Sequence, residues 1–247
     1  MVFASELRLG EPPRLGGGMH AQIDLAALAG HAAVLRTRRG QSIALTAADP
    51  DAIFLIRSGF LTLECALPGT QPHIVALLLP GDVVRSKDLP PLCVSSLRGH
   101  AAGEIYRLRG TTAASLAMQM PSLARHLEDA QARYPARQAV HTIALAQFDC
   151  AQKVATFLIE LAARSGLRSR DGIRVEVPLS RKEIADYLGI NPDTLSRVMS
   201  RLKSRGLIEM GPQRRALIRD LGALCKISPA AQSLLRMHNA EELCAVA

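Results

Sequence analysis

The sequence has no segment long and apolar enough to suggest a membrane span. Its longest apolar run, Ile74–Leu79, is far shorter than the roughly 20 residues that cross a bilayer. The N-terminal residues, MVFASELRLGEPPRLGGGMH, lack the basic stretch followed by an apolar stretch that marks a secretory signal. We therefore expect a cytoplasmic protein with no membrane partner.

Closely spaced cysteines are also absent. The five cysteines form no C-x-x-C pair: Cys65, Cys93, Cys150, Cys225 and Cys244. An odd, scattered set is typical of reduced thiols and gives no support to a zinc ribbon or a closely spaced iron–sulfur site. No nucleophile–base set, metal-ligand spacing or phosphate loop stands out, so we do not expect an enzyme.

Positive charge is abundant and unevenly placed. The formal net charge is +8 at pH 7, and residues 178–226 contribute +5 of it, from ten basic and five acidic side chains. Such a concentration is typical of a nucleic-acid-binding module. A solvated basic surface is the alternative that charge alone leaves open.

The chain of 247 residues, 48% of them hydrophobic, is long enough for two small domains. Residues 1–20 are expected to be a flexible leader, because they combine Pro12-Pro13 with Gly16-Gly17-Gly18. Residues 21–110 predict an antiparallel β-barrel or jelly roll, because short apolar segments alternate with turn residues. The strands expected there are Gln41–Leu45, Ala52–Ser58, Leu61–Ala66, His73–Leu79 and Glu104–Leu108.

Residues 111–148 predict a long connecting helix. Pro121 suits a first helical turn, and apolar residues recur at helical spacing from Leu123 onward. Pro135 interrupts this pattern, so we expect a kink or break near Tyr134 and a helix that is bent or loosely packed. The helix has two possible partners, the barrel and a second subunit.

Residues 149–226 predict a winged helix-turn-helix, and 227–247 a C-terminal tail. A helix over Ala151–Arg164 precedes a loop at Ser165–Gly172. Ser180 and Glu183 form a capping box for a helix over Arg181–Leu188, which Gly189 ends. Asn191 and Pro192 then start a second helix, which reaches about Ser204.

The second helix presents side chains that suit the edges of DNA bases. Arg197 can fork onto guanine O6 and N7, Asp193 can accept from cytosine N4, and Ser196 can serve several edges. Alternatives remain, because Asp193 also complements the helix dipole and Arg197 can instead contact a phosphate or be a surface charge. Two strands follow around Gly211-Pro212 as a wing that carries Arg214 and Arg215.

Over residues 25–225 the sequence resembles the CRP/FNR superfamily of bacterial transcription regulators. The shared features are the barrel with its Pro80–Val84 turn, the long helix, and the motif PLSRKEIADYLGINPDTLSR. Asp193-Thr194-Leu195-Ser196-Arg197 is most similar to the Glu-x-x-Ser-Arg of the FNR/FixK branch, which reads palindromes such as TTGAT-N4-ATCAA. Aspartate in place of glutamate predicts a relaxed or shifted half-site.

The resemblance implies an α+β fold and a homodimeric, sequence-specific DNA-binding regulator. Its expected partners are double-stranded DNA and RNA polymerase, and activation is expected rather than repression. The phosphate contacts that we expect are Ser180, Arg181, Arg201, Lys203, Arg214 and Arg215. The dimer contacts that we expect are Leu123, Leu127, Ala130, Tyr134, Gln138 and His141.

The controlling signal is not evident from the sequence. Ser95, Ser96 and Arg98 imitate the cyclic-nucleotide cassette of the family only weakly, and no cysteine precedes Cys65 to build the N-terminal iron–sulfur site. We expect no tightly bound cofactor. A haem- or cyclic-nucleotide-responsive sensor is the alternative. The histidines available to haem are His20, His31, His73, His100, His126 and His141.

Overall fold

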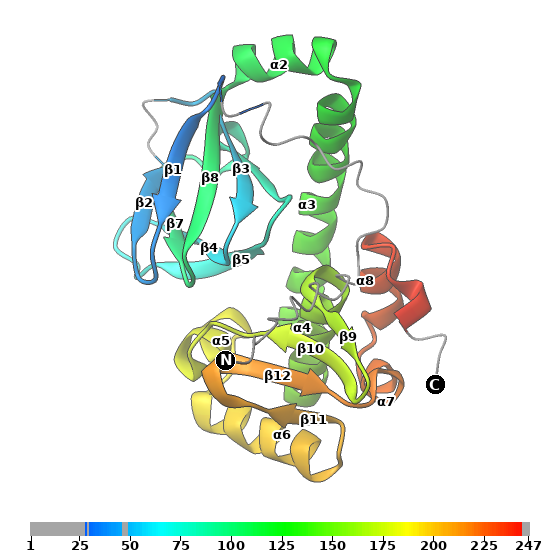
Figure 1. The fold of residues 1–247 in the computed structure, drawn as a ribbon. Helices are drawn as coiled ribbons and strands as arrows, with labels where there is room; N and C mark the ends of the chain where they lie inside the picture. Colours follow the sequence, from blue (N-terminus) through cyan, green and yellow to red (C-terminus); the bar gives the residue numbers. More distant parts are fainter. Residues whose placement is uncertain (1–27, 29, 46–48, 244–247) are drawn as a thin grey trace, which may run out of the picture.

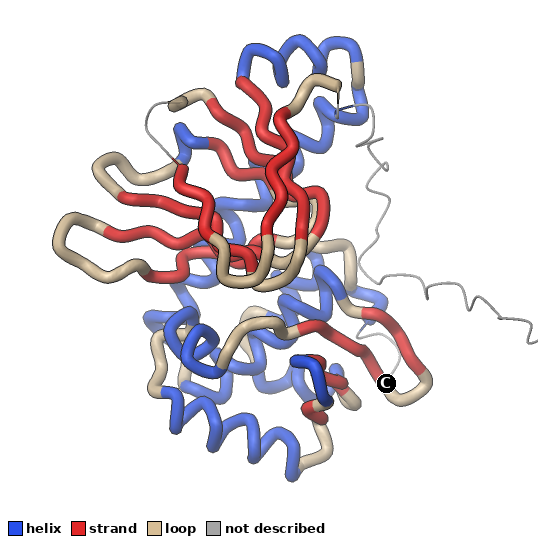
Figure 2. Tube along the Cα trace, turned by 60° about the vertical axis from the view of Figure 1, so that its left-hand side comes forward, coloured by secondary structure: helices blue, strands red, loops and turns tan. Residues whose placement is uncertain are grey.

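A computed structural model describes residues 28, 30–45 and 49–243, so the expected leader, His20 and Cys244 lie outside the described residues. The protein has an α+β fold. Figure 1 places an antiparallel β-barrel at one end, a helical half with a small sheet at the other, and helix α3 alongside both. Figure 2 shows the same division from a second side.

Two four-stranded antiparallel sheets form the barrel, in the orders β1-β8-β3-β6 and β2-β7-β4-β5. Their bounds are β1 Ala33–Thr37, β2 Ser42–Leu45, β3 Ala52–Ser58, β4 Leu61–Ala66, β5 His73–Leu78, β6 Val83–Arg85, β7 Val94–Gly99 and β8 Gly103–Arg109. Side chains such as Phe54, Ile56 and Leu97 fill the space between the sheets. The five predicted strands are confirmed to within one residue at each end.

Three barrel strands, β1, β6 and β7, were not predicted, because they are short or bury small and polar residues. β7 alternates correctly, yet two of its three buried positions are Ser95 and Gly99. β6 has three residues, and Val34 in β1 is 42% exposed. Their hydrogen-bonded partners, rather than their own composition, hold these segments in strands.

The predicted long helix is two helices. α2 covers Gly110–Gln119, and α3 begins with Pro121 at its first position and continues to Gln147. The expected break near Tyr134 is wrong, because α3 runs through Pro135 without interruption. The Pro135 side chain is exposed, so its ring takes no space in the core.

The predicted dimer contacts face the chain's own barrel and C-terminal half. Leu123 is buried beneath α2, and Tyr134 packs on the barrel core. Gln138 Nε2 donates to the carbonyl of Val75 at 3.0 Å. Leu127 and Ala130 line a hollow between α2, α3 and the barrel. The His141 ring stacks on Tyr187 of α5. All six positions thus have contacts within one chain, and their role in a dimer stays a prediction.

The C-terminal half contains five helices among the described residues. They are α4 Cys150–Ser165, α5 Arg181–Tyr187, α6 Pro192–Ser204, α7 Leu221–Ile227 and α8 Ala231–Met237. A sheet in the order β11-β12-β10-β9 packs beside them. Its strands are β9 Leu167–Ser169, β10 Gly172–Glu176, β11 Ile208–Met210 and β12 Arg215–Ile218.

Two expectations about this half need correction. Part of the expected loop Ser165–Gly172 is strand β9, which has only three residues and pairs with β10. The expected tail after residue 226 is also structured. Leu234 and Leu235 of α8 are buried in the same core as α4, so α8 is an integral part of this half.

A buried carboxylate joins the two halves. Asp82, in the turn before β6, accepts from Arg137 of α3 at 2.7 Å and also pairs with Arg164 of α4. Arg164 in turn contacts Glu160 at 2.7 Å. Because Asp82 belongs to the barrel, this network fixes the barrel turn against α3 and α4.

Candidate nucleic-acid interface

The helix pair α5–α6 is set by local hydrogen bonds. Ser180 Oγ accepts from the Glu183 N–H at 3.2 Å, and the Ser180 N–H donates to Glu183 Oε2 at 2.6 Å, which confirms the capping box. Gly189, at a φ of 59°, makes the turn, and the Asn191 side chain accepts from the Asp193 N–H at 2.8 Å. The sequence therefore determines where each helix begins.

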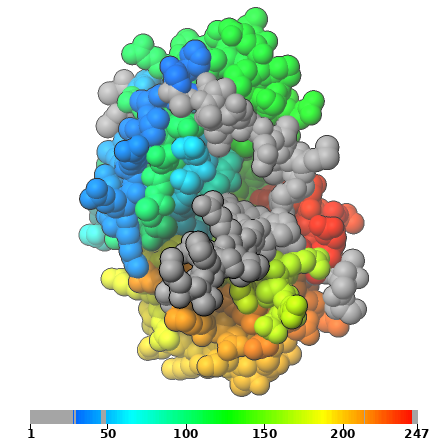
Figure 3. Space-filling model, in the orientation of Figure 1, coloured from blue at the N-terminus to red at the C-terminus, as the bar shows by residue number. Residues whose placement is uncertain are grey.

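Helix α6 has one buried face and one exposed face. Leu195, Val198 and Leu202 dock it on the core. The opposite face carries an open hollow of about 690 Å³, lined by Thr194, Ser196, Arg197, Ser200 and Arg201. Figures 1 and 3 place α6 at the end of the molecule away from the barrel. The structure thus brings together the predicted Ser196, Arg197 and Arg201.

Ser200 and Thr194 were not named as site residues. Ser200 follows Ser196 by four positions, so helical spacing alone was enough to place it on this face. Thr194 precedes Arg197 by three, which is the other spacing of neighbours on a helix surface. Both hydroxyls extend the polar character of the face.

The polar side chains on the exposed face of α6 differ in whether they already have partners within the protein. Among the described residues, no carboxylate lies within ion-pair distance of Arg197 or Arg201, and both are exposed. The Ser196 hydroxyl donates to the carbonyl of Pro192 at 3.0 Å, so its oxygen is left as an acceptor. The Asp193 side chain is exposed at the first turn of α6.

The phosphate contacts predicted around α5 and the wing separate into two groups. Arg181, Lys203 and Arg215 are exposed. Arg214 instead turns inward: its guanidinium donates to the carbonyl of Pro178, and its carbonyl accepts from the Val177 N–H at 2.8 Å. This contact ties the wing to the segment before α5, and a phosphate contact by Arg214 stays a prediction. Ser180 Oγ is engaged as the cap of α5.

Helix α5 also contacts two histidines of the barrel and one histidine of α3. His73 Nδ1 lies 3.2 Å from Asp186, and His100 Nδ1 lies 3.7 Å from Glu183. The His141 ring stacks on Tyr187 with centroids 4.1 Å apart. Asp186 and Glu183 therefore hold α5 to the barrel, while Tyr187 holds it to α3.

Burial lowers the pKa of both His100 and His141, so these rings favour the neutral form. His100 Nε2 is also 2.9 Å from Thr62 Oγ1. Three of the histidines considered for haem thus have protein contacts on α5. No group of three or more potential metal ligands occurs among the described residues.

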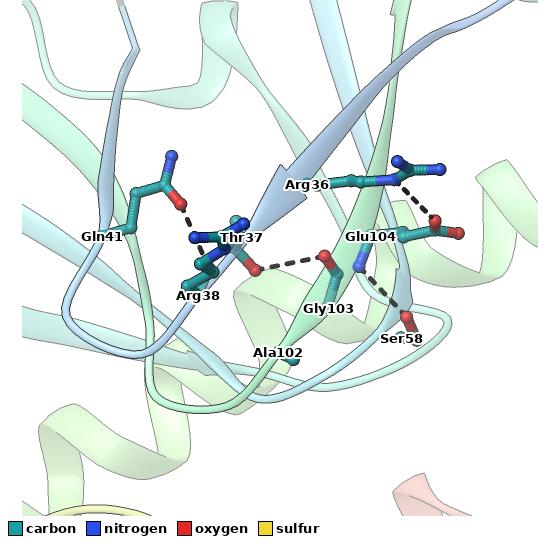
Figure 4. A pocket seen from close by; sticks show the side chains of 8 residues that line it. All are labelled: Arg36, Thr37, Arg38, Gln41, Ser58, Ala102, Gly103 and Glu104. Carbon is teal, nitrogen blue, oxygen red and sulfur yellow. Dashed lines mark hydrogen bonds and ion pairs between the residues drawn. The ribbon is translucent and has the colours of Figure 1, made fainter.

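The barrel surface has an open hollow of about 660 Å³ at its turn end (Figure 4). Glu104 at its edge takes Arg36 at 3.3 Å and Arg57 as ion-pair partners. The hollow lies between the β1–β2, β3–β4 and β7–β8 turns, outside the barrel core. Because Glu104 already compensates two guanidiniums, we assign no function to this hollow.

The family comparison matches the helical half. A family model described as the Crp-like helix-turn-helix domain matches residues 152–227. Over 184 residues, the chain is 28% identical to the transcriptional activator protein FnrA of Stutzerimonas stutzeri, covering 73% of this chain and 74% of that protein. It is also 28% identical to the nitrogen fixation regulation protein FixK of Azorhizobium caulinodans, with 71% of each chain covered.

A solved structure supports the same fold over most of the chain. FixK2 from Bradyrhizobium japonicum matches with a TM-score of 0.66 and 23% identity, covering 81% of this chain and 98% of that one. Residues 152–227 are thus a Crp-like helix-turn-helix domain, and over most of its length the chain is similar to transcription regulators of the CRP/FNR type. Within the matched domain, α5 and α6 are the helix-turn-helix, and α8 lies beyond the match. No helix among the described residues has the length and apolarity needed to cross a membrane.

Proposed function

We propose that this protein is a homodimeric transcription activator of the CRP/FNR type that reads a palindromic DNA site with α6. The observation that carries the proposal is the exposed face of α6, where Arg197 and Arg201 have no carboxylate partner among the described residues. A duplex supplies the missing anionic and acceptor groups, and an α-helix fits its major groove. RNA polymerase is the further partner that activation requires, and we propose no catalytic activity.

We assign base contacts to three residues of α6. Arg197 takes a guanine through O6 and N7, and Asp193 faces a cytosine amino group. The Ser196 hydroxyl already donates a hydrogen bond to the Pro192 carbonyl, so toward DNA it accepts from an amino group rather than donating. Because the Asp193 side chain is short, we expect a half-site related to TTGAT but altered at the cytosine opposite its guanine.

We assign the phosphate contacts to Arg181, Arg201, Lys203 and Arg215, all exposed around α5, α6 and the wing. Arg214 is excluded from this group because Pro178 already binds its guanidinium. Backbone contacts of this kind position a protein on DNA without reading its sequence.

The dimer contact that we propose lies on the outer face of α3. Its exposed residues Ala132, Ala136, Ala139, Ile143 and Ala146 follow one another at spacings of four and three. That alternation is the repeat of a two-helix seam, and alanine lets two helices approach closely. Ile143, 53% exposed, is the largest apolar side chain available to a partner there.

We propose that the protein needs no haem or iron–sulfur cluster and acts in the cytoplasm, where its DNA is. The contacts of His73, His100 and His141 with α5 give these rings a structural role that needs no metal. An absorption spectrum of purified protein tests this proposal, and a Soret band would contradict it.

The decisive test is selection of binding sites from random duplex DNA, followed by titration of the recovered palindrome. Arg197→Ala is expected to cost about 1–3 kcal/mol on that palindrome and to weaken discrimination at one guanine per half-site. Arg109→Ala, an exposed arginine of the barrel, is the matched control. Equal losses on the palindrome and on scrambled duplex would reduce Arg197 to a phosphate contact, and no selected palindrome would refute the proposed function.

A further inference from the structure

Two cysteines of the barrel lie side by side. Cys65 is in β4, and its Cα partner in β7 is Ser95. Cys93 lies one residue before β7 and two before Ser95. Since side chains alternate along a strand, Cys93 and Ser95 point to the same side of the sheet, toward Cys65. The pairing of β4 with β7 therefore brings together thiols that are 28 positions apart in sequence.

The contacts around these thiols agree with the register. Cys65 Sγ lies 3.3 Å from Ser95 Oγ, and Cys93 is near enough to add to the effect of burial, which raises the pKa of the Cys65 thiol. Cys93 Sγ is 4.0 Å from the carbonyl of its neighbour Val94. Both are free thiols and both are partly exposed, so a small oxidant can reach them.

The segment before Cys93 holds a strained residue. Leu92 has a φ of 61°, which a residue with a branched side chain seldom adopts, and its side chain is 88% exposed. No core packing fixes such a residue, so the segment has freedom to move toward β4.

We propose that Cys65 and Cys93 form a dithiol site that peroxide converts reversibly to a disulfide, and that closing this disulfide changes how the barrel packs on α3. The site itself is independent of DNA binding. Its regulatory role rests on the proposed function.

The chemistry needs one peroxide and two thiols. The Cys93 thiolate, which is nearer the loop, attacks one oxygen of hydrogen peroxide; the O–O bond breaks, and after proton transfer a sulfenic acid and one water result. The Cys65 sulfur then attacks the Cys93 sulfur; the S–S bond forms, the S–O bond breaks and a second water leaves. Burial raises the pKa of the Cys65 thiol and so disfavours its thiolate, which argues against Cys65 as the sulfur that peroxide oxidises first. A dithiol reductant reverses the change.

Forming the Cys65–Cys93 disulfide requires a movement of residues that pack near α3. Diagonal neighbours in an antiparallel pair have Cβ atoms somewhat under about 7–8 Å apart, whereas a disulfide needs about 4 Å. Cys93 must therefore approach β4 and draw its loop along. Leu89 at the start of that loop, Cys65 and Tyr134 of α3 all pack on one core cluster. Burial, with Cys65 nearby, raises the pKa of Tyr134 to about 12, which agrees with close packing there.

The test uses the full-length protein treated with hydrogen peroxide. The five thiols of the sequence are expected to fall to three in unfolded protein, and peptide mapping is expected to recover Cys65 linked to Cys93 within one chain. Cys93→Ser must abolish that peptide, and Cys150→Ser, with its cysteine in α4, must keep it. Hydrogen exchange of α3 around Tyr134 is expected to change on oxidation and to return after reduction.

Different results would refute the dithiol site and its coupling to α3. Five remaining thiols, a sulfinic acid on Cys93 with Cys65 unmodified, or linkage between two chains would each refute the dithiol site. A Cys65–Cys93 disulfide with unaltered exchange in α3 would refute the coupling. If reduced protein binds a selected palindrome, oxidation is expected to shift its affinity about fivefold or more. If it binds none, the proposed function fails while the thiol count and the exchange measurement still decide this site.

Discussion

At the scale of single residues, the best-defined interaction is the one that the barrel turn makes with α3 and α4. Asp82 is buried with Arg137 and Arg164, whose side chains are 9% and 4% exposed. These guanidiniums hold the pKa of Asp82 at about 2 against the opposing effect of burial. Because its folded pKa lies below the usual 3.8, the carboxylate stabilises the fold above about pH 4 and loses that effect as the pH falls through 2.

Asp82→Asn is expected to lower the free energy of unfolding by about 3–5 kcal/mol at pH 7, because it leaves two buried cations without their shared anion. Urea denaturation measures the change. The control is Asp88→Asn, which removes a more exposed carboxylate paired with Arg85 at 2.6 Å and should cost less than about 1 kcal/mol. Equal losses in the two variants would show that burial does not strengthen the Asp82 network.

His238 gives a second dependence on acid, in a different pH range. Its Nε2 is buried without a hydrogen-bond partner, and burial together with Arg164 and Arg137 lowers its pKa to about 3. The unfolded chain takes up this proton near pH 6.5 whereas the folded chain resists it, so the fold loses stability as the pH falls from 6.5 toward 3.

His238→Leu is expected to flatten the fall in unfolding free energy between pH 6.5 and about 4, because leucine has no proton to exclude. Urea titrations at several pH values provide the measurement. His31→Leu, at an exposed position, should leave the fall unchanged. An unaltered slope in His238→Leu would mean that other groups cause the acid sensitivity.

Residue roles were predictable from sequence where both partners are close in the chain. Ser180 and Glu183 are three residues apart, and their capping box is confirmed. The contact of Arg214 with Pro178 could not be predicted, because the two residues are 36 positions apart and only the folded wing brings them together. The same limit hid the contact between Cys65 and Cys93, which depends on strand register.

At the scale of elements, the periodicity of α3 correctly predicted a helix, but it did not show which face of that helix packs on the barrel. The large apolar residues Leu123 and Tyr134 attracted the prediction of a dimer seam, yet the chain's own barrel covers them. The exposed repeat consists mainly of alanine, which carries little hydrophobic signal. A helix packed between a barrel and a partner needs two such faces, and single-sequence periodicity does not say which face meets which neighbour.

The dimer contact proposed on the outer face of α3 can be tested by introducing one negative charge there. Ala139→Glu is expected to convert the dimer to a monomer at micromolar concentration, because two carboxylates would face each other across a close contact. Light scattering after size exclusion gives the mass. Gln131→Glu, exposed on α3 outside the seam, should remain dimeric. A dimeric Ala139→Glu protein with native stability would move the interface elsewhere.

At the scale of the whole molecule, charge and contacts divide the protein into a barrel half and a DNA-binding half that meet at α5. Residues 178–226 carry +5 of the net +8, and their exposed arginines lie on the helix-turn-helix and wing. On the side facing the barrel, α5 presents Glu183 and Asp186 to His100 and His73. The positive surface thus remains free for DNA while the acidic residues of α5 are used between the halves.

This division predicts how binding depends on salt. Each phosphate contact releases bound cations from DNA, so Arg215→Ala should reduce the slope of log affinity against log salt concentration by about 1. Arg214→Ala should leave that slope unchanged and lower the unfolding free energy instead, because its guanidinium binds Pro178 rather than a phosphate. Affinity titrations on one duplex at several salt concentrations, paired with urea denaturation, separate the two arginines. A reduced slope in Arg214→Ala at unchanged stability would show that this side chain leaves Pro178 for DNA, and the wing would then reach the backbone with both arginines.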